Sequence, residues 1–156
     1  MSQSPPSQPS QPSLFGSQDG GAATANVDGG ARGNPGPAGY GVRIERGDGA
    51  IVELKESLGT ATNNVAEYRG LLAALEWAAQ HGVERLHVRS DSLLLVKQML
   101  GEYRVKHQGL LPLHERARSL VRQIGRVTFE HVRREQNKDA DRLANEAMDE
   151  AAATGT

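Results

Sequence analysis

The sequence predicts an α/β domain in which helices cover both faces of a mixed sheet. Two observations predict this class. Antiparallel strand patterns separated by glycine-rich turns come first, and helical patterns that alternate with further strands follow them. A strand–helix–strand unit has a crossover that makes its strands parallel, so the sheet contains both kinds of pairing. The predicted element order is β-β-β-α-β-α-α-β-α.

The first three strands are predicted from alternating apolar residues and from the turns between them. Residues 23–28 form a short extended run that ends at Asp28, and a Gly/Pro-rich turn follows over residues 29–39. Residues 40–44 alternate like a half-buried strand. The turn at 47–49 then predicts a hairpin, in which residues 51–55 return antiparallel.

A helix and a fourth strand come next. Asn63 or Asn64 can cap the helix, and Gly82 ends it. Its apolar residues fit one face, which we expect to be buried: Leu71, Leu72, Leu75, Ala78 and Ala79. Residues 86–88 then form a strand that stops at Ser90-Asp91.

The last third of the chain predicts three helices and one strand. Ser92 caps a helix that runs through Leu100, and Gly101 ends it. A third helix is indicated by Leu110, Leu113, Ala117, Leu120, Val121 and Ile124. The last strand covers residues 127–132. The final helix carries an apolar stripe of Ala140, Leu143, Ala144, Ala147 and Met148.

Composition excludes several classes of function. The absence of cysteine excludes a disulfide scaffold, thiolate catalysis and any Cys-ligated metal. The 18 Lys and Arg residues against 19 Asp and Glu give a net charge of −1, so no global basic field indicates a nucleic-acid partner. No apolar run reaches the roughly 18 residues of a membrane span, so we expect no membrane partner.

Residues 1–21 are predicted to be a disordered tail. Residues 1–20 hold six Ser, four Gln and four Pro, and such a composition buries too little apolar surface to fold. They have no basic and apolar signal segments, so we expect a cytoplasmic protein. The single domain is expected over residues 22–150, and residues 151–156 are expected to be a flexible C-terminus.

Four acidic residues stand where a core-facing element needs no acid. Asp28 and Asp91 end two predicted strands, and Glu67 and Asp141 lie in the first turns of two predicted helices. Strand ends and helix starts of an α/β sheet meet at one edge. If the two strands are neighbours, the sequence therefore predicts that all four carboxylates converge.

Converging carboxylates without a basic residue among them would repel one another and resist ionising together. A divalent cation resolves this conflict, and oxygen-only ligands select Mg²⁺ or Mn²⁺ over zinc. Two such ions ~3.5–4 Å apart can activate a water and stabilise a leaving oxygen in phosphodiester cleavage. The alternative is that each acid merely complements a helix dipole or stabilises a turn.

The acids lie inside longer motifs that follow one another along the chain. These are Asp28-Gly29-Gly30, Asn34-Pro35-Gly36-Pro37-Ala38-Gly39-Tyr40-Gly41, Thr62-Asn63-Asn64-Val65-Ala66-Glu67, Ser90-Asp91-Ser92 and Asn137-Lys138-Asp139-Ala140-Asp141-Arg142-Leu143-Ala144. Together they resemble ribonuclease H type 1 over nearly the whole domain. The resemblance implies the ribonuclease H-like fold, with a five-stranded mixed sheet of three antiparallel plus two parallel strands. It also implies endonucleolytic cleavage of the RNA in RNA–DNA hybrids, with 5′-phosphate and 3′-hydroxyl products.

The resemblance implies roles for individual residues. The catalytic and metal-binding acids would be Asp28, Glu67, Asp91 and Asp141, with Asp28 bridging two Mg²⁺ or Mn²⁺ ions. The substrate-binding residues would be Asn34, Thr62, Asn63, Asn64 and Arg134. Asn side chains offer a donor and an acceptor to a 2′-hydroxyl or a base edge. We expect a monomer whose partner is an RNA–DNA hybrid, and activity on double-stranded RNA stays open.

Two features depart from the better-known bacterial members of the family. The loop at residues 133–137 has no histidine, so Arg133 or Arg134 would bind the phosphate, or His131 would substitute. The connection at residues 102–108 is too short for the basic helical protrusion of many relatives, so the sequence resembles the compact branch. Residues 116–142, with eight basic and four acidic residues, are a candidate source of hybrid affinity. For Arg118 and Arg122 a solvated helix face is the simpler interpretation.

Two other functions remain open from the sequence. One is a non-catalytic module that binds hybrids or duplexes, although concentrated negative charge would oppose phosphate binding. The other is a different nuclease of the same superfamily, such as a resolvase or an exonuclease.

Overall fold

The computed structural model describes residues 21–154, so the expected disordered tail lies almost wholly outside the described residues. The elements are β1 (Ala22–Ala31), β2 (Gly36–Arg46), β3 (Ile51–Ala61), α1 (Asn63–Gln80), β4 (Arg85–Ser90), α2 (Leu93–Met99), α3 (Leu111–Ile124), β5 (Arg126–His131), the 3₁₀ helix η1 (Arg134–Gln136) and α4 (Lys138–Thr154). Apart from η1, this is the predicted order. Among the described residues, no helix is long and apolar enough to cross a membrane.

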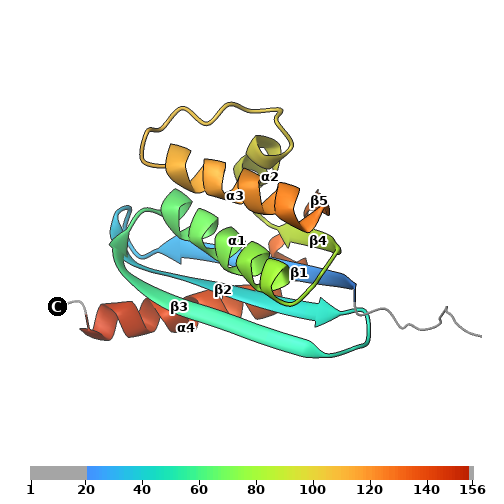
Figure 1. Cartoon of the computed structure of the whole chain (residues 1–156). Coiled ribbons are helices and arrows are strands. Elements are labelled where there is room, and N and C mark those ends of the chain that lie inside the picture. Colours follow the sequence, from blue (N-terminus) through green and yellow to red (C-terminus); the bar gives the residue numbers. More distant parts are fainter. Residues whose placement is uncertain (1–20, 155–156) are drawn as a thin grey trace, which may run out of the picture.

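The sheet has five strands in the order β3-β2-β1-β4-β5. The pairs β1–β2 and β2–β3 are antiparallel, whereas β1–β4 and β4–β5 are parallel. Helices α1 and α3 lie on one face of the sheet, and α4 lies on the other (Figure 1). The predicted mixed sheet with helices on both faces is confirmed.

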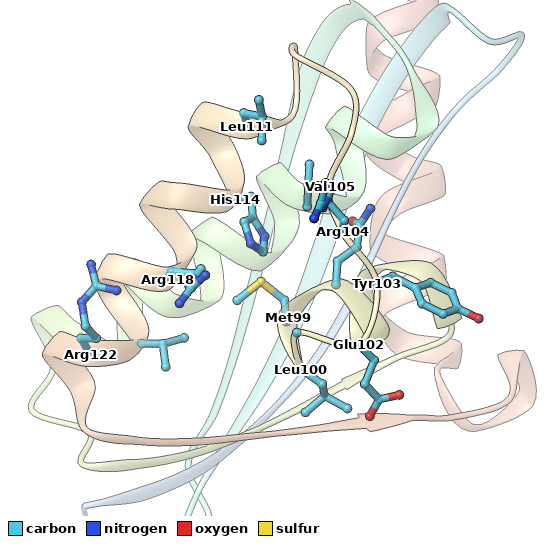
Figure 2. A pocket seen from close by; sticks show the side chains of 13 residues that line it. Met99, Leu100, Glu102, Tyr103, Arg104, Val105, Leu111, His114, Arg118 and Arg122 are labelled. Carbon is cyan, nitrogen blue, oxygen red and sulfur yellow. The ribbon is translucent and has the colours of Figure 1, made fainter.

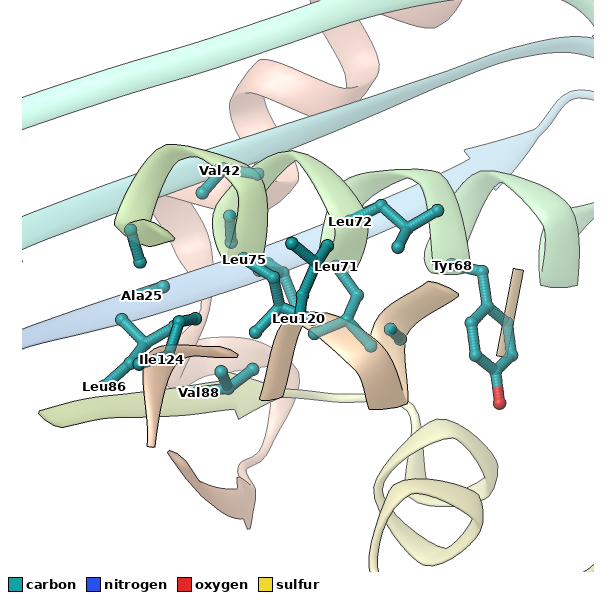
Figure 3. Packing of buried hydrophobic residues seen from close by; sticks show 14 of the residues in the cluster. Ala25, Val42, Tyr68, Leu71, Leu72, Leu75, Leu86, Val88, Leu120 and Ile124 are labelled. Atoms are coloured by element: carbon teal, nitrogen blue, oxygen red, sulfur yellow. The ribbon is translucent and has the colours of Figure 1, made fainter. Parts of the chain in front are cut away.

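The main core lies between the sheet and helices α1 and α3. Figure 3 shows Leu71 and Leu75 of α1 packed with Val42 and Val88 of the strands and with Leu120 of α3. All five side chains are almost fully buried. Removal of this apolar surface from water supplies the main driving force for the layer.

Helix α4 packs closely against β2 because two glycines leave room for it. A Cβ atom at Gly39 would lie 2.5 Å from the Cβ of Ala147, and one at Gly41 would lie 2.4 Å from the Cβ of Leu143. Real Cβ atoms do not approach so closely, so a side chain at either glycine would push the helix away. The predicted apolar stripe of α4 is the buried face of this contact.

Three predicted boundaries are corrected. Strand β1 does not end at Asp28 but continues to Ala31, because Asp28 to Ala31 pair with β2 after the pairing with β4 has ended. Helix α1 is capped by Thr62 and not by an asparagine, since the Thr62 side chain accepts a hydrogen bond from the Val65 backbone N–H at 3.2 Å. Glu67 consequently lies in the second turn of α1.

The C-terminal boundary at residue 150 is also wrong. Helix α4 continues to Thr154, so the described residues 151–154 are helical. The reason is that Ala151 extends the spacing of Ala147 and Met148 along the same buried face.

Candidate active site

The register of two parallel strands brings Asp28 and Asp91 together. In the β1–β4 pair, the last partners are Val27 and Ser90. Each aspartate is the residue that follows its strand's last partner, so both stand at the carboxyl edge of the parallel pair. The condition on which the predicted site depended, that these strands are neighbours, is met.

Glu67 reaches this edge because α1 packs directly on the backbone of β1. A Cβ atom at Gly29 would lie 2.4 Å from the backbone O of Ala66 and 2.7 Å from the backbone N of Glu67. Glycine is therefore required here for close approach of strand and helix. Glu67 thereby reaches the edge at which Asp91 lies, and the charge of Asp91 acts on its carboxyl group.

Asp141 is held in place by a buried asparagine. The Asn137 side chain is 1% exposed; its Nδ2 donates to the Val27 carbonyl at 2.9 Å, and its Oδ1 accepts from Asn26 Nδ2 at 2.9 Å. The Asp141 backbone N–H in turn donates to the Asn137 carbonyl at 3.0 Å. Asn137 thus ties the start of α4 to the strand that carries Asp28.

Asp28 has the most perturbed carboxyl group of the four. Burial, the negative charge of Asp91, and a hydrogen bond and charge interaction with Asp141 raise the pKa of Asp28 from its ordinary 3.8 to about 8. The backbone N–H of Gly29 donates to Asp28 Oδ1 at 2.9 Å and opposes this rise. At neutral pH the site therefore favours a proton, or a cation in its place, over four bare carboxylates.

Glu67 and Asp91 also have raised pKa values. Burial raises the pKa of Glu67 to about 7, and the charge of Asp91 adds to the rise while a hydrogen bond from Ser92 opposes it. Burial also raises the pKa of Asp91, and Asp141 adds to the rise, while a backbone hydrogen bond and the nearby side chains of Arg134 and His131 oppose it. The interactions that link Asp28 with Asp91 and Asp141, and Glu67 with Asp91, join residues that lie far apart in the chain, as the predicted convergence of the acids requires.

The donor set fits a hard divalent cation. All four side chains offer only carboxylate oxygens, which Mg²⁺ and Mn²⁺ prefer. Within residues 21–154, no three His, Asp or Glu side chains are placed so that they could hold a metal ion, whereas Asp28 interacts with both Asp91 and Asp141. Such an open arrangement suits Mg²⁺, which in proteins is usually held by one or two carboxylates together with water and substrate phosphates.

The predicted substrate-binding residues lie at the start of α1 and in the turn beside it. Asn34 Oδ1 accepts from the Asn63 backbone N–H at 3.0 Å, and Asn63 Oδ1 accepts from the Ala31 backbone N–H at 2.8 Å. These bonds join the β1–β2 turn to the helix that Thr62 caps. Asn64 is exposed beside them. The structure thus brings the four residues together on one surface.

Arg134 approaches the acids from the other side. Its Nη2 lies 3.9 Å from Asp141 Oδ1, and its side chain is 79% exposed, so it can also reach a ligand above the site. His131, the last residue of β5, is near enough to Asp91 to affect its pKa. For Arg133, no ion pair with an acid is found in the described part of the chain.

Two residues that support the acids were not assigned by sequence reasoning. Asn137 was part of a recognised motif, but its burial and its bond to β1 depend on a contact across 110 positions. Ser92 was expected only as a helix cap, and it also bonds to Glu67. The available signal was the place of these two polar residues in the sequence, Asn137 one helical turn before Asp141 and Ser92 directly after Asp91.

Comparison with known proteins gives several matches. Residues 26–147 match the reverse transcriptase-like family. The bifunctional protein Rv2228c of Mycobacterium tuberculosis is 52% identical over 128 residues, covering 81% of this chain and 35% of that protein. The chain thus spans about a third of the length of this relative. The structure of the N-terminal RNase H domain of Rv2228c has a TM-score of 0.83 at 47% identity, covering 86% of this chain and 99% of that one.

Two further relatives are similar over most of this chain. Ribonuclease HI of Halobacterium salinarum is 45% identical over 133 residues, covering 85% of this chain and 67% of that protein. The structure of LC11-RNase H1 in complex with an RNA/DNA hybrid has a TM-score of 0.78 at 40% identity, covering 83% of this chain and 99% of that one. These likenesses agree with the resemblance found from the motifs.

Proposed function

The chain belongs to the ribonuclease H type 1 family, in its compact branch, and we propose from this that it hydrolyses the RNA strand of RNA–DNA hybrids. The observation that carries the proposal is the meeting of Asp28, Asp91, Glu67 and Asp141 at one sheet edge, with the pKa of Asp28 raised to about 8. The hybrid in the complex of LC11-RNase H1 supports the choice of substrate.

The reaction adds water across a phosphodiester bond. The water oxygen attacks phosphorus, the P–O3′ bond breaks, and the products carry a 5′-phosphate and a 3′-hydroxyl. Two Mg²⁺ or Mn²⁺ ions, when bound, would supply activation of the water and stabilisation of the leaving oxygen. The four acids would hold them, and Asp28, which interacts with both Asp91 and Asp141, would contribute to both.

The remaining residues would position the substrate. Thr62 would contact a phosphate of the DNA strand, and Asn34, Asn63 and Asn64 would face the sugars and the base edges. Arg134 would bind the scissile phosphate, which its exposure and its 3.9 Å approach to Asp141 support. A guanidinium keeps its proton in proteins, so Arg134 would act through its charge and not as a base.

The test compares matched RNA–DNA, RNA–RNA and DNA–DNA duplexes in Mg²⁺ and in Mn²⁺. We expect cleavage of the hybrid, and a loss of about 1000-fold or more in kcat for Asp28→Asn, because several kcal/mol of transition-state stabilisation disappear. The matched control is Asp48→Asn in the β2–β3 turn, at the opposite end of the strands, which should leave kcat unchanged.

Two results would contradict the proposal. Unchanged cleavage by Asp28→Asn would show that the acids are wrongly assigned. Binding of the hybrid by the wild-type protein without cleavage in either metal would favour the non-catalytic binding module.

A further inference from the structure

A cleft of about 790 Å³ lies between α2, the α2–α3 connection and α3. Figure 2 shows Arg118 and Arg122 on α3 at one side of this cleft and Arg104 of the connection at the other. The floor between them is apolar and is formed in part by Met99, Val105 and Val121. The proposed hydrolysis of the hybrid does not use any of these side chains.

A second hollow continues from the cleft toward the active site. It has a volume of about 480 Å³, and Arg104 lines it as well as the cleft. Its other lining residues include Lys106 and His107 of the connection and Asn64 at the start of α1. The two hollows therefore adjoin at Arg104, and their lining residues extend from Asn64 at the start of α1 to Arg122 on α3.

The cations along this path are not neutralised. Within residues 21–154, no carboxylate lies within ion-pair distance of the four residues Lys106, Arg104, Arg118 and Arg122, which we call the cationic strip. Glu102, the acid that lines both hollows, is paired with Lys97 at 2.7 Å.

Some basic residues elsewhere on the surface, in contrast, form ion pairs with acids. Lys55 bonds to Glu146 and Glu150 at 3.1 Å each, and Arg142 bonds to Glu53 at 2.7 Å. Unpaired cations arranged in a line along a groove are the arrangement that a polyanionic backbone neutralises best, because each phosphate contact releases counterions. Tyr103, 49% exposed beside the strip, adds an aromatic surface.

We propose that the sugar–phosphate backbone of the bound hybrid continues from the active site past Asn64 and onto the cationic strip. This inference rests on the proposed function for its substrate. The strip provides affinity along the duplex and takes no part in the chemical step. Lys106 and Arg104 contact the phosphates nearer the cut, and Arg118 and Arg122 contact more distant ones.

The experiment measures KM, kcat and the salt dependence of hybrid binding for Arg104→Gln/Lys106→Gln. We expect an unchanged kcat, a KM raised about tenfold, and a plot of log Kd against log salt whose slope falls by about one for each lost phosphate contact. The matched control is Arg116→Gln/Arg126→Gln, which removes the same charge from residues outside both hollows and should keep the wild-type slope.

Hybrid length provides a second readout that a merely structural role would not move. Arg118→Gln/Arg122→Gln should raise KM on a long hybrid and leave KM unchanged on a hybrid shortened to the cut site and its immediate neighbours. An equal rise in KM on the long and the short hybrid would overturn the assignment of Arg118 and Arg122 to the more distant phosphates.

If Arg104→Gln/Lys106→Gln keeps the KM and the salt slope of the wild-type protein, the whole inference is overturned. This result is expected if the cationic strip binds an acidic protein segment instead of the hybrid. Binding is measured by fluorescence anisotropy, independently of cleavage. If the wild-type protein cleaves no duplex, the proposed function is refuted. The anisotropy data would still show whether the cationic strip binds the hybrid.

Discussion

At the scale of one residue, the carboxyl group of Asp28 shows how the fold changes the ionisation of a side chain in the candidate site. Burial is the largest contribution to its raised pKa, and the neighbouring acids Asp91 and Asp141 add to it. A group in this position is costly to ionise, so it binds a proton or a cation strongly. Asn137 keeps this arrangement in place by bonding to the residue that precedes Asp28, Val27.

The raised pKa of Asp28 predicts a pH-dependent stability of the metal-free protein. Between the ordinary pKa and about 8, the native protein holds a proton that the unfolded chain has lost, so the free energy of unfolding falls as pH rises. The loss is up to about 1.4 kcal/mol per pH unit for one group. Asp28→Asn removes this loss, so urea unfolding in EDTA should show the variant gaining at least about 1 kcal/mol over wild type between pH 5 and pH 8. A difference that stays constant with pH would contradict the prediction, and Asp48→Asn provides the baseline.

At the scale of elements, the site depends on how closely α1 and α4 approach the sheet. Gly29 allows α1 to lie on β1, and Gly39 and Gly41 allow α4 to lie on β2. The acids Glu67 and Asp141 are carried by these two helices. A shift of either helix would therefore move a carboxylate relative to Asp28 even if the sheet stayed intact.

Two neighbouring glycines test this dependence. Gly29→Ala would place a Cβ 2.4 Å from the backbone of α1, so we expect a loss of about 1–3 kcal/mol in stability and a kcat lowered by about 100-fold through displacement of Glu67. Gly30→Ala is the matched control, because its Cβ would meet its nearest neighbour, Met148, at an ordinary 3.5 Å. We expect the control to change stability by less than about 0.5 kcal/mol. Urea unfolding and hybrid cleavage measure both variants, and equal behaviour of the two would argue against helix packing as the cause.

At the scale of the whole molecule, a net charge of −1 conceals a strongly uneven distribution. The acids concentrate at one sheet edge, whereas the unpaired cations form the strip beside α2 and α3. The basic segment at 116–142 does not act as one patch, because Arg116 pairs with Glu76 and Arg142 pairs with Glu53. Only the three-dimensional pairing shows which positive charges are available to a ligand.

This distribution predicts that divalent cations stabilise the folded protein. At a Mg²⁺ concentration 100 times its Kd, binding to the native state alone should add about 2.7 kcal/mol to the free energy of unfolding. We expect a corresponding rise in Tm at pH 8 for wild type and a much smaller one for Asp28→Asn, with NaCl of equal ionic strength as the control. An equal rise in both proteins would place the bound cation elsewhere.

Local sequence patterns were sufficient to predict the order of the elements, which the structure confirms, and to single out the four acids as candidates. Alternation, helical periodicity and glycine turns depend on neighbours within a few residues, so they can be recognised in one chain. The ends of the strands, of the helices and of the domain were predicted less well. Asp28 looked like a strand end and residue 150 like a domain end, because the pairing with β2 and the packing of Ala151 depend on distant segments.

The sequence by itself determined the residue types, the motifs that identify the family and the carboxylate side chains of the candidate site. The tertiary structure decided that Val27 and Ser90 are register partners, that Asn137 joins two segments 110 positions apart, and that Arg104 and Arg118 line one cleft without a paired acid. The physical reason is that burial and charge depend on distance in space. Contacts between residues far apart in the chain set those distances, and they form only when the sheet and its helices assemble.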